Sequence, residues 1–189
     1  MGLGMKAVVP FQRYGVTLKR LEEDMLEQVR SWRNSPEVAK HMLQQGEISK
    51  EQQENWYQGL QEDDSRIYWV AWFKEQPIGV ASLTKIDLSK GSAEPGMYIY
   101  PEQFKNNIIP FCVAFALNDF AFEELGLTTL VGKIFVDNEA SVRFHEKCGY
   151  KSTSQITHVE EQQKDLQWYS LNRKDYEAAK APIARFIRY

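Results

Sequence analysis

Three side chains that lie far apart in the sequence could bind a ligand carrying phosphate groups. Arg33 stands three residues before Pro36, which biases the chain away from helical geometry, so we expect Arg33 at a turn where a side chain can reach a ligand. Arginine offers a fork of donors and lysine a point positive charge, so Arg33 and Lys85 suit a diphosphate. The polarizable Met42 could lie against a flat base. A ligand that joins a diphosphate to a flat base, such as UDP, would suit these three side chains. As purely structural residues, Arg33 would complement the helix dipole, Lys85 would be solvated and Met42 would fill the core.

A second group of side chains could move protons. His145 has a reference pKa of about 6.5 and could act as an acid or a base near neutral pH, whereas Lys133 would need burial to lower its pKa before it could accept a proton. Ser141 lies one helical turn before His145, which predicts a polar pair on a face turned away from the core. The alternative is that His145 is an ordinary residue of a helix surface. His41 and His158 fall on other elements, so we expect no metal site.

Composition and charge exclude several classes of protein. The 189 residues are 43% hydrophobic, which is enough for one buried core, and no linker or charged block divides residues 1–189. A formal net charge of -3 without a basic cluster argues against a nucleic-acid partner. The first residues lack the apolar segment of a signal peptide, and no run reaches the roughly 18 apolar residues that span a bilayer, so we expect a cytoplasmic protein without membrane contact. Cys112 and Cys148 are too widely spaced for a redox or zinc motif and are expected to be core thiols.

The elements that must position these groups are centred on residues 110–150. The first part of this stretch is apolar on most sides and predicts a buried helix, which starts at Pro110 and stops at Gly126. Residues 130–135 read as a strand. Asn138, preceded by an aspartate, can cap a second helix that carries the serine and histidine described above. The sequence therefore predicts a helix, a strand and a capped helix in the middle of the fold.

Hydrophobic periodicity predicts the remaining elements. A Ser-Lys-Glu-Gln capping box marks a helix start at 49–52, and runs of β-branched and aromatic residues mark strands. Residues 90–96 read as a turn, Asp175 as the cap of a terminal helix, and Pro182 as its break. In chain order we expect strand 16–21, helix 22–32, a helix from 49, strands 67–73, 78–88 and 97–100, helix 110–125, strand 130–135, a helix after 138, and strands 155–159 and 165–171. This order predicts an α/β fold with a mixed, mostly antiparallel sheet flanked by helices.

This element order and two motifs resemble a known family. NEASVRFHEKCGY at 138–150 and WRNSPEV at 32–38 are similar to motifs of the GCN5-related N-acetyltransferases (GNAT), across roughly residues 15–172, which leaves a helical tail at 173–189. The resemblance implies the GNAT acyl-CoA N-acyltransferase fold, acetyl-CoA as co-substrate and no metal. It also implies direct attack of a primary amine on the thioester, without a nucleophilic residue.

Within the family, WRNSPEVAKHML, IGVASLTKIDL and YIYPEQF most resemble the N-acetyltransferases of pseudaminic-acid biosynthesis. Those enzymes acetylate the 4-amino group of a UDP-linked dideoxy amino sugar that is destined for flagellin glycosylation. The resemblance implies that Arg33, Met42, Thr84 and Lys85 line the nucleotide-sugar pocket. It also implies that the coenzyme contacts Tyr98, Ile99, Lys105, Asn106, Asn107, Ile108, Asn138 and Ser141, with His145 and Lys133 as the catalytic candidates.

Three positions depart from the family pattern. The loop before the central helix normally contains glycines, so that backbone N–H groups can hold the coenzyme pyrophosphate. Here Ile108 stands at the first of these glycines, and Pro110 removes an N–H altogether. Lys105 could supply the positive charge of that loop. Lys133 stands where the sugar enzymes have a glutamate that draws off the amine proton, and His145 stands where a tyrosine commonly protonates the thiolate.

Two other functions stay open on sequence grounds. One is acetylation of a protein α-amine, as in the ribosomal-protein acetyltransferases, or of an antibiotic amine; an acidic acceptor groove would favour it. The other is a binding module on an altered GNAT scaffold, which the missing glycines and Lys133 would favour. The stereochemistry of the acceptor and the oligomeric state, with a homodimer as one option, are not determined by these patterns.

Overall fold

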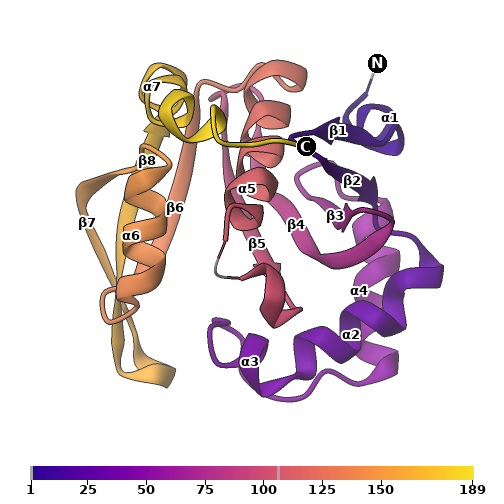
Figure 1. Cartoon of the computed structure of the whole chain (residues 1–189). Coiled ribbons are helices and arrows are strands. Elements are labelled where there is room, and N and C mark those ends of the chain that lie inside the picture. The colour runs from indigo at the N-terminus through magenta and orange to yellow at the C-terminus, as the bar shows by residue number, and fades with distance from the viewer. Residues whose placement is uncertain (1, 106) are drawn as a thin grey trace.

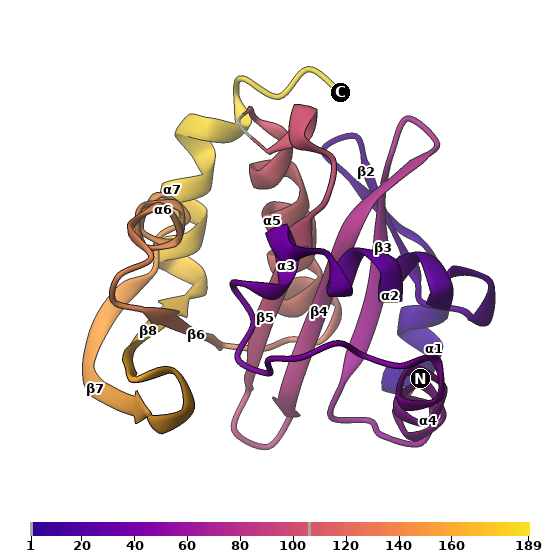
Figure 2. The same ribbon diagram turned by 90° about the horizontal axis from the view of Figure 1, so that it is seen from below.

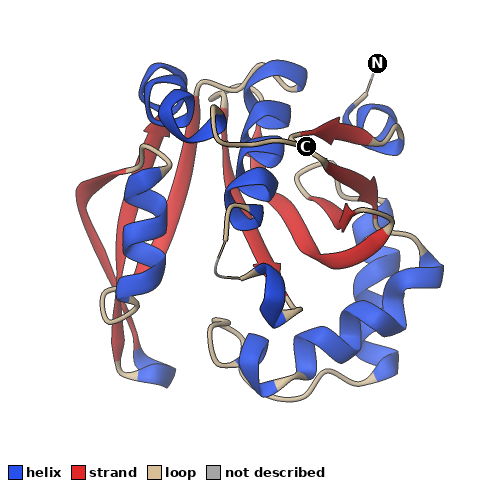
Figure 3. Ribbon diagram, viewed as in Figure 1, coloured by secondary structure: helices blue, strands red, loops and turns tan. Residues whose placement is uncertain are grey.

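The computed structural model describes residues 2–105 and 107–189, which form an eight-stranded sheet with helices on both faces (Figures 1 and 3). The strand order is β1-β2-β3-β4-β5-β6-β8-β7. The strands are β1 (Phe11–Arg13), β2 (Val16–Arg20), β3 (Ile67–Phe73), β4 (Gln76–Asp87), β5 (Ser92–Ile99), β6 (Thr129–Phe135), β7 (Lys151–Val159) and β8 (Lys164–Asn172). The α-helices are α1 (Leu3–Val8), α2 (Leu26–Asn34), α3 (Pro36–Ala39), α4 (Lys50–Gln61), α5 (Ile109–Asp119), α6 (Glu139–Lys147) and α7 (Arg173–Ala184). The expected α/β class with a mixed, mostly antiparallel sheet is confirmed.

The two faces of the sheet are covered by different helices. α5, α6 and α7 lie on one face, while α2 and α4 lie on the other (Figure 2). The larger core is on the α5 face, because nearly every side chain of this helix is buried there. The smaller core contains Val29, Trp32 and Leu60 from α2 and α4, packed against Val70 and Val80 of the sheet. Each strand of the middle of the sheet therefore sends alternate residues to two different environments.

The pairing between β5 and β6 is parallel and short, whereas every other pair of neighbouring strands is antiparallel. It consists of Ser92 with Thr129 and Ala93 with Leu130. Past these residues the strands diverge (Figure 1), and residues 94–99 and 131–135 have no strand partner across the opening. We call this opening the splay and the last pair its vertex. Backbone groups along its two edges are left available for a ligand.

Most elements predicted from periodicity are present. The capping box forms, since the Ser49 side chain accepts from the Gln52 N–H and the Gln52 side chain accepts from the Ser49 N–H. Asn138 caps α6 by accepting from the Ser141 N–H. The central helix begins at Ile109 and ends in a π-helical turn, Phe120–Glu124, just before Gly126. These elements were predictable because their signals are local.

Four expectations about elements are wrong or incomplete. Residues 92–96 belong to strand β5 and are not a turn; Pro95 is tolerated because it lies just past the vertex, where one edge of β5 has no ladder to complete. Asn172, and not Asp175, caps α7, since its Oδ1 accepts from the Asp175 N–H. Pro182 lies inside α7 without breaking it. No element was expected before residue 16, yet α1 and β1 are formed there.

A buried carboxylate joins the first hairpin, α5 and α7. Asp119 is 1% exposed and accepts hydrogen bonds from the Tyr176 hydroxyl at 2.6 Å and from the Lys180 ammonium at 3.0 Å on one oxygen. Arg13 and Tyr14 donate to the other oxygen, at 3.2 and 2.5 Å. Glu123 and Glu177 lie close enough to complete a three-carboxylate group of the kind that binds metals. In this structure, however, Arg13 and Lys180 provide the positive charge. Arg13 also forms an ion pair with Glu123, and Lys180 also forms one with Glu177.

No helix in residues 2–105 and 107–189 has the length and hydropathy needed to cross a bilayer.

Candidate active site

A group of charged side chains lies at the vertex of the splay, on the face of the sheet opposite α5. Glu94 of β5 lies one residue past the vertex, and its Oε1 is 2.7 Å from the Lys133 Nζ of β6. Lys85 of β4 also approaches this oxygen, at 3.3 Å. The Lys133 ammonium lies 4.1 Å from the centre of the Trp168 ring, its partner on β8. Thr84 Oγ1 donates to the Glu94 carbonyl at 3.4 Å. Three of the predicted site residues are thus brought together around a glutamate that sequence reasoning missed.

The two lysines of this group differ in how firmly they hold their protons. Burial lowers the pKa of Lys133, and the neighbouring Lys85 acts in the same direction, while Glu94 opposes both. The pKa of Lys85 is raised, first through its contact with the Lys133 side chain and then through Glu94. Lys133 is 15% exposed and Lys85 is 66% exposed. Lys133 is therefore held between a carboxylate and an indole ring, whereas Lys85 faces solvent.

A second polar pair lies further along β5 on the same face. The Arg33 Nη1 atom and the Tyr98 hydroxyl are both buried and have no hydrogen-bond partner within the described residues. The two side chains interact electrostatically, and Arg33 Nη2 donates to the Gln44 carbonyl at 2.7 Å. Burial raises the pKa of Tyr98, so its hydroxyl stays protonated, and burial lowers the pKa of Arg33, which remains a cation. Buried donors without acceptors are costly, and such atoms commonly bind a ligand or water.

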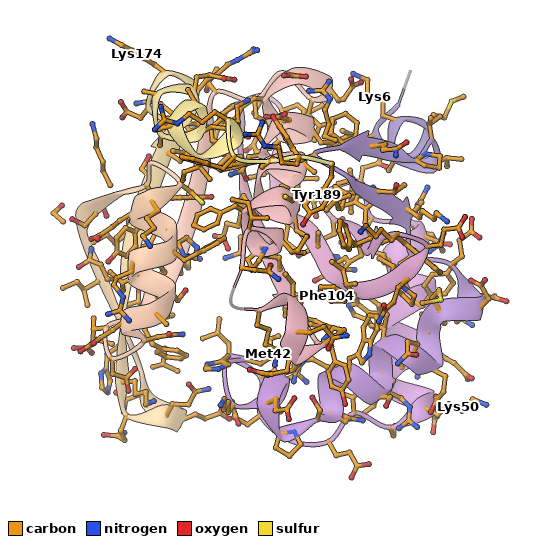
Figure 4. All side chains as sticks on the ribbon, viewed as in Figure 1. Lys6, Met42, Lys50, Phe104, Lys174 and Tyr189 are labelled. Atoms are coloured by element: carbon orange, nitrogen blue, oxygen red, sulfur yellow. The ribbon has the colours of Figure 1, made fainter. Side chains whose placement is uncertain are left out.

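The two predicted phosphate-binding cations do not converge. Lys85 pairs with Glu94, while Arg33 lies beside Tyr98, four residues further along the same strand. At about 3.3 Å per residue this separation is roughly 13 Å. Met42 lies on the segment after α3, in the region of Phe104 (Figure 4). Its carbonyl, together with that of Leu43, accepts from the Gln162 side chain at the β7–β8 turn, at 3.3 and 2.7 Å. The predicted UDP residues thus form two groups.

The loop before α5 has satisfied most of its polar groups internally. Asn107 Oδ1 accepts from the Ile109 N–H at 2.8 Å, and Pro110 has no N–H, so two donors of the first turn are unavailable to a pyrophosphate. The Lys105 ammonium pairs with Glu102 at 3.0 Å and with Glu37 at 3.7 Å. Asn106, another residue expected to contact the coenzyme, lies outside the described residues. The loop is therefore further from an open anion site than its lack of glycines suggests.

His145 is turned toward the sheet. Its ring packs 5.1 Å from the Tyr150 ring, and its Cδ2 edge lies over Gly132, where an added Cβ would come within 3.5 Å of it. The prediction that Ser141 and His145 both face away from the core is therefore wrong for His145; Gly132 leaves room for the ring against β6. Nδ1 lies 2.7 Å from the Ser141 carbonyl, which can only accept, so Nδ1 carries the proton and Nε2 is free to accept one. Burial lowers the pKa of His145, which favours the neutral ring.

The two catalytic candidates lie on opposite faces of β6. Gly132 points to α6 and His145, so its neighbour Lys133 points to the face that carries Glu94. Ile99 is buried in the α5 core, whereas Tyr98 faces α2, so a coenzyme could reach Ile99 only through its backbone. The Asn138 side chain and the Ser141 N–H are bonded to each other in the α6 cap. No single group of residues therefore unites all the predicted contacts.

The family model for the acetyltransferase (GNAT) domain matches residues 16–151, which is more than two thirds of the chain and includes the splay and α6. This chain belongs to the GNAT family. It is an acetyl-CoA-dependent N-acetyltransferase, in agreement with the expectation from its motifs.

Individual relatives are more distant. Acetyltransferase PseH from Campylobacter jejuni strain 81-176 is 26% identical over 133 residues, which cover 67% of this chain and 77% of that protein. The spermidine N-acetyltransferase of Vibrio cholerae, solved in complex with CoA and spermine, superposes with a TM-score of 0.78 at 21% identity and covers 87% of this chain and 99% of that one. A GCN5-related N-acetyltransferase from Brucella melitensis gives 0.78 at 17% identity, covering 95% and 86%. The structural matches establish the shared fold.

Acetyl-CoA fits the unpaired edge of β5 better than it fits the first turn of α5. The unpaired edge of β5 past the vertex offers backbone donors and acceptors to an extended ligand. The first turn of α5, by contrast, presents a proline and an N–H already bonded to Asn107. When bound, acetyl-CoA supplies an activated acetyl group, and the protein must supply the site for the amine and a path for its proton.

Proposed function

We propose that this GNAT enzyme acetylates the 4-amino group of a UDP-linked amino sugar. The observation that carries the proposal is the pair of buried donors, Arg33 Nη1 and the Tyr98 hydroxyl, which have no acceptor within the described residues. Each of these two groups can donate a hydrogen bond to an anion or to a carbonyl oxygen. The pair therefore suits the diphosphate or the uracil base of UDP. This acceptor implies a cytoplasmic enzyme of pseudaminic-acid biosynthesis, on the route to glycosylated flagellin.

Two further features support a nucleotide-linked acceptor over a polyamine. Arg33 lies in the WRN segment, and Thr84 and Lys85 lie in the Thr-Lys-Ile segment, and both segments resemble the nucleotide-sugar enzymes. A polycation such as spermine brings no acceptor atoms for Arg33 and would be repelled by its charge. The carboxylate nearest the splay vertex, Glu94, is already matched by two lysines. The acceptor side is therefore not an acidic groove.

The proposal is tested by comparing UDP, UMP and spermine as stabilising ligands in thermal unfolding. A ligand at 100 times its Kd adds about 2.7 kcal/mol to the stability of the folded state. We expect UDP to stabilise the protein most, UMP to do so less, and spermine to do so least. Arg33→Ala should weaken UDP binding about 10–150-fold, because a charge-assisted hydrogen bond contributes roughly 1.5–3 kcal/mol.

Arg30 provides the matched control. It is an arginine of the same helix, but its guanidinium is bonded to Glu27 at 2.6 and 3.0 Å and to the Ile48 carbonyl. Arg30→Ala should leave the response to UDP unchanged, and both variants should bind acetyl-CoA like the parent. Absence of a UDP effect in the parent, or equal loss of UDP and acetyl-CoA binding in Arg33→Ala, would contradict the nucleotide-sugar assignment.

A further inference from the structure

At the vertex of the splay, the Glu94 carboxylate lies beside the Lys85 ammonium group, which can move away from it. Among residues 94–99 and 131–135, all of which the structure describes, Glu94 is the one acidic residue. It is 22% exposed, so its side chain is reachable from solvent. Lys85 approaches it at 3.3 Å from a position in the left-handed backbone region (φ 49°), where the β4–β5 ladder is irregular. The Lys85 side chain has no other ion-pair partner in the described part of the chain.

Lys133 and Lys85 hold this carboxylate in different ways. Lys133 is fixed on its other side by the Trp168 ring, and both neighbours favour its charged form. It can therefore hold the Glu94 side chain in place during a reaction. Lys85 has only solvent around most of its side chain, and a surface ion pair of this kind contributes little to stability. An incoming ammonium ion can replace Lys85 at small cost, but it cannot easily replace Lys133.

We propose that Glu94 is the ammonium-binding residue of the acceptor site and the group that takes the acceptor's proton, and that Lys85 occupies this ammonium position when no acceptor is bound. The inference rests on acetyl transfer itself and holds for any primary amine, whether or not it is linked to a nucleotide. Lys133 is a positioning residue for the carboxylate in this scheme. The family pattern places the proton-accepting glutamate on β6, where this chain has Lys133. In this proposal Glu94 of β5 takes over that role.

These groups account for both protons that the acceptor ammonium loses in the reaction. The acceptor ammonium gives one proton to the Glu94 carboxylate, and the free amine nitrogen forms a C–N bond to the acetyl carbonyl carbon. The C–S bond breaks as the amide forms, and the second N–H proton leaves with the sulfur as the thiol of CoA. Glu94 then returns its proton to solvent. Loss of such a proton acceptor typically lowers the rate about 10²–10⁴-fold.

Methylamine is the probe for the test, because it carries an ammonium group and no phosphate or carbonyl oxygen to which Arg33 and Tyr98 could donate. Release of CoA thiol is followed from pH 6 to 9 for the parent, Glu94→Gln and the control Glu27→Gln, which removes a carboxylate paired with Arg30 on α2. The parent binds the ammonium form, so its rate should vary little with pH. Glu94→Gln must wait for free amine, so its rate should be at least 100-fold lower at pH 7 and rise about tenfold per pH unit, because alkylammonium groups have a pKa near 10.4.

The variant Lys85→Met should have the opposite effect to Glu94→Gln, because it should improve the use of methylamine. Removing the competing ammonium should lower KM for methylamine at least threefold with kcat unchanged. An increase in KM would contradict the proposal that Lys85 occupies the ammonium position when no acceptor is bound. Equal pH profiles for the parent and Glu94→Gln, or no CoA release above the uncatalysed rate in the parent, would overturn the role of Glu94. Failure of UDP to stabilise the protein would leave all of these outcomes unaffected, so the two proposals fail independently.

A measurement without acetyl-CoA checks the ammonium position directly. The side-chain carbon next to Lys85 Nζ is followed by NMR while methylammonium chloride is added, with sodium chloride as the ionic-strength control. Displacement from Glu94 should remove the part of the raised pKa of Lys85 that comes from this carboxylate, and so lower that pKa in a saturable manner. Glu94→Gln should show no saturable change. A response to sodium chloride equal to that for methylammonium would show a screened surface ion pair and no ammonium site.

Discussion

The proposed acceptor side and the proposed coenzyme side of the splay differ in how their polar groups are satisfied. On the acceptor side, Arg33 Nη1 and the Tyr98 hydroxyl are buried without partners, and Glu94 is reachable from solvent. On the coenzyme side, the Ile109 N–H is bonded to Asn107 and Lys105 is paired with two glutamates. On this proposed assignment, the acceptor side is arranged in advance, while binding of the coenzyme would require internal contacts to break. Affinity for the two ligands should respond to mutation in opposite directions, since truncation removes ready-made contacts on one side and releases occupied groups on the other.

The largest expected effect concerns the chemistry on the coenzyme side. If His145 moves a proton during turnover, as its neutral ring and free Nε2 allow, His145→Ala should lower kcat about 10²–10⁴-fold with little change in KM. Because burial lowers the pKa of His145, the parent should lose activity only as the pH falls below the usual histidine value of about 6.5. That acidic limb should be missing from His145→Ala. His158→Ala, at an exposed histidine paired with Asp165, is the control, and unchanged turnover in His145→Ala would leave His145 as a packing residue under Tyr150.

The next effect is on acetyl-CoA affinity at the first turn of α5. Replacing Ile108 and Pro110 together with glycine restores an N–H and removes the Ile108 side chain, which packs against the α5 core. One charge-assisted hydrogen bond is worth roughly 1.5–3 kcal/mol, so the variant should bind acetyl-CoA at least tenfold more tightly in calorimetric titration. Binding by the parent in the low micromolar range would show instead that this loop already holds the pyrophosphate well. UDP binding should not change.

The smallest effect comes from releasing Lys105. Glu102→Gln removes its nearer ion-pair partner, which is exposed, so the gain for an anionic ligand should not exceed about fivefold, the equivalent of roughly 1 kcal/mol. The gain should vanish in high salt, because exposed charges are screened. Glu139→Gln, which breaks an exposed pair with Arg143 on α6, serves as the control. A salt-independent change in acetyl-CoA affinity would show that Glu102 shapes the loop and does not merely neutralise Lys105.

Prediction succeeded where the controlling interactions are local. The capping box at Ser49 and the cap at Asn138 each involve residues within one turn of helix, and both are formed. The family motifs at 32–38 and 138–150 are also short runs, which is why the fold class and the acetyltransferase activity followed from them. Pro95 and Gly96 are local turn signals and predict a turn at residues 90–96, yet residues 92–96 belong to β5. The position of Pro95 beside an unpaired edge reversed that preference, and no local pattern reports such an edge.

The sequence by itself determined the helices with marked ends, the alternation of the central strands and the residue types that acetyl transfer requires, because each depends on neighbours along the chain. Only the tertiary structure decided where β5 and β6 stop pairing, and hence that Glu94 meets Lys133 across the splay. It also decided that Tyr98 lies beside Arg33, and that His145 and Lys133 occupy opposite faces of one strand. These relations depend on strand register and on the side of the sheet that each residue faces. Shifting a strand by one residue would exchange every such contact, so they are set by the packing of the whole sheet.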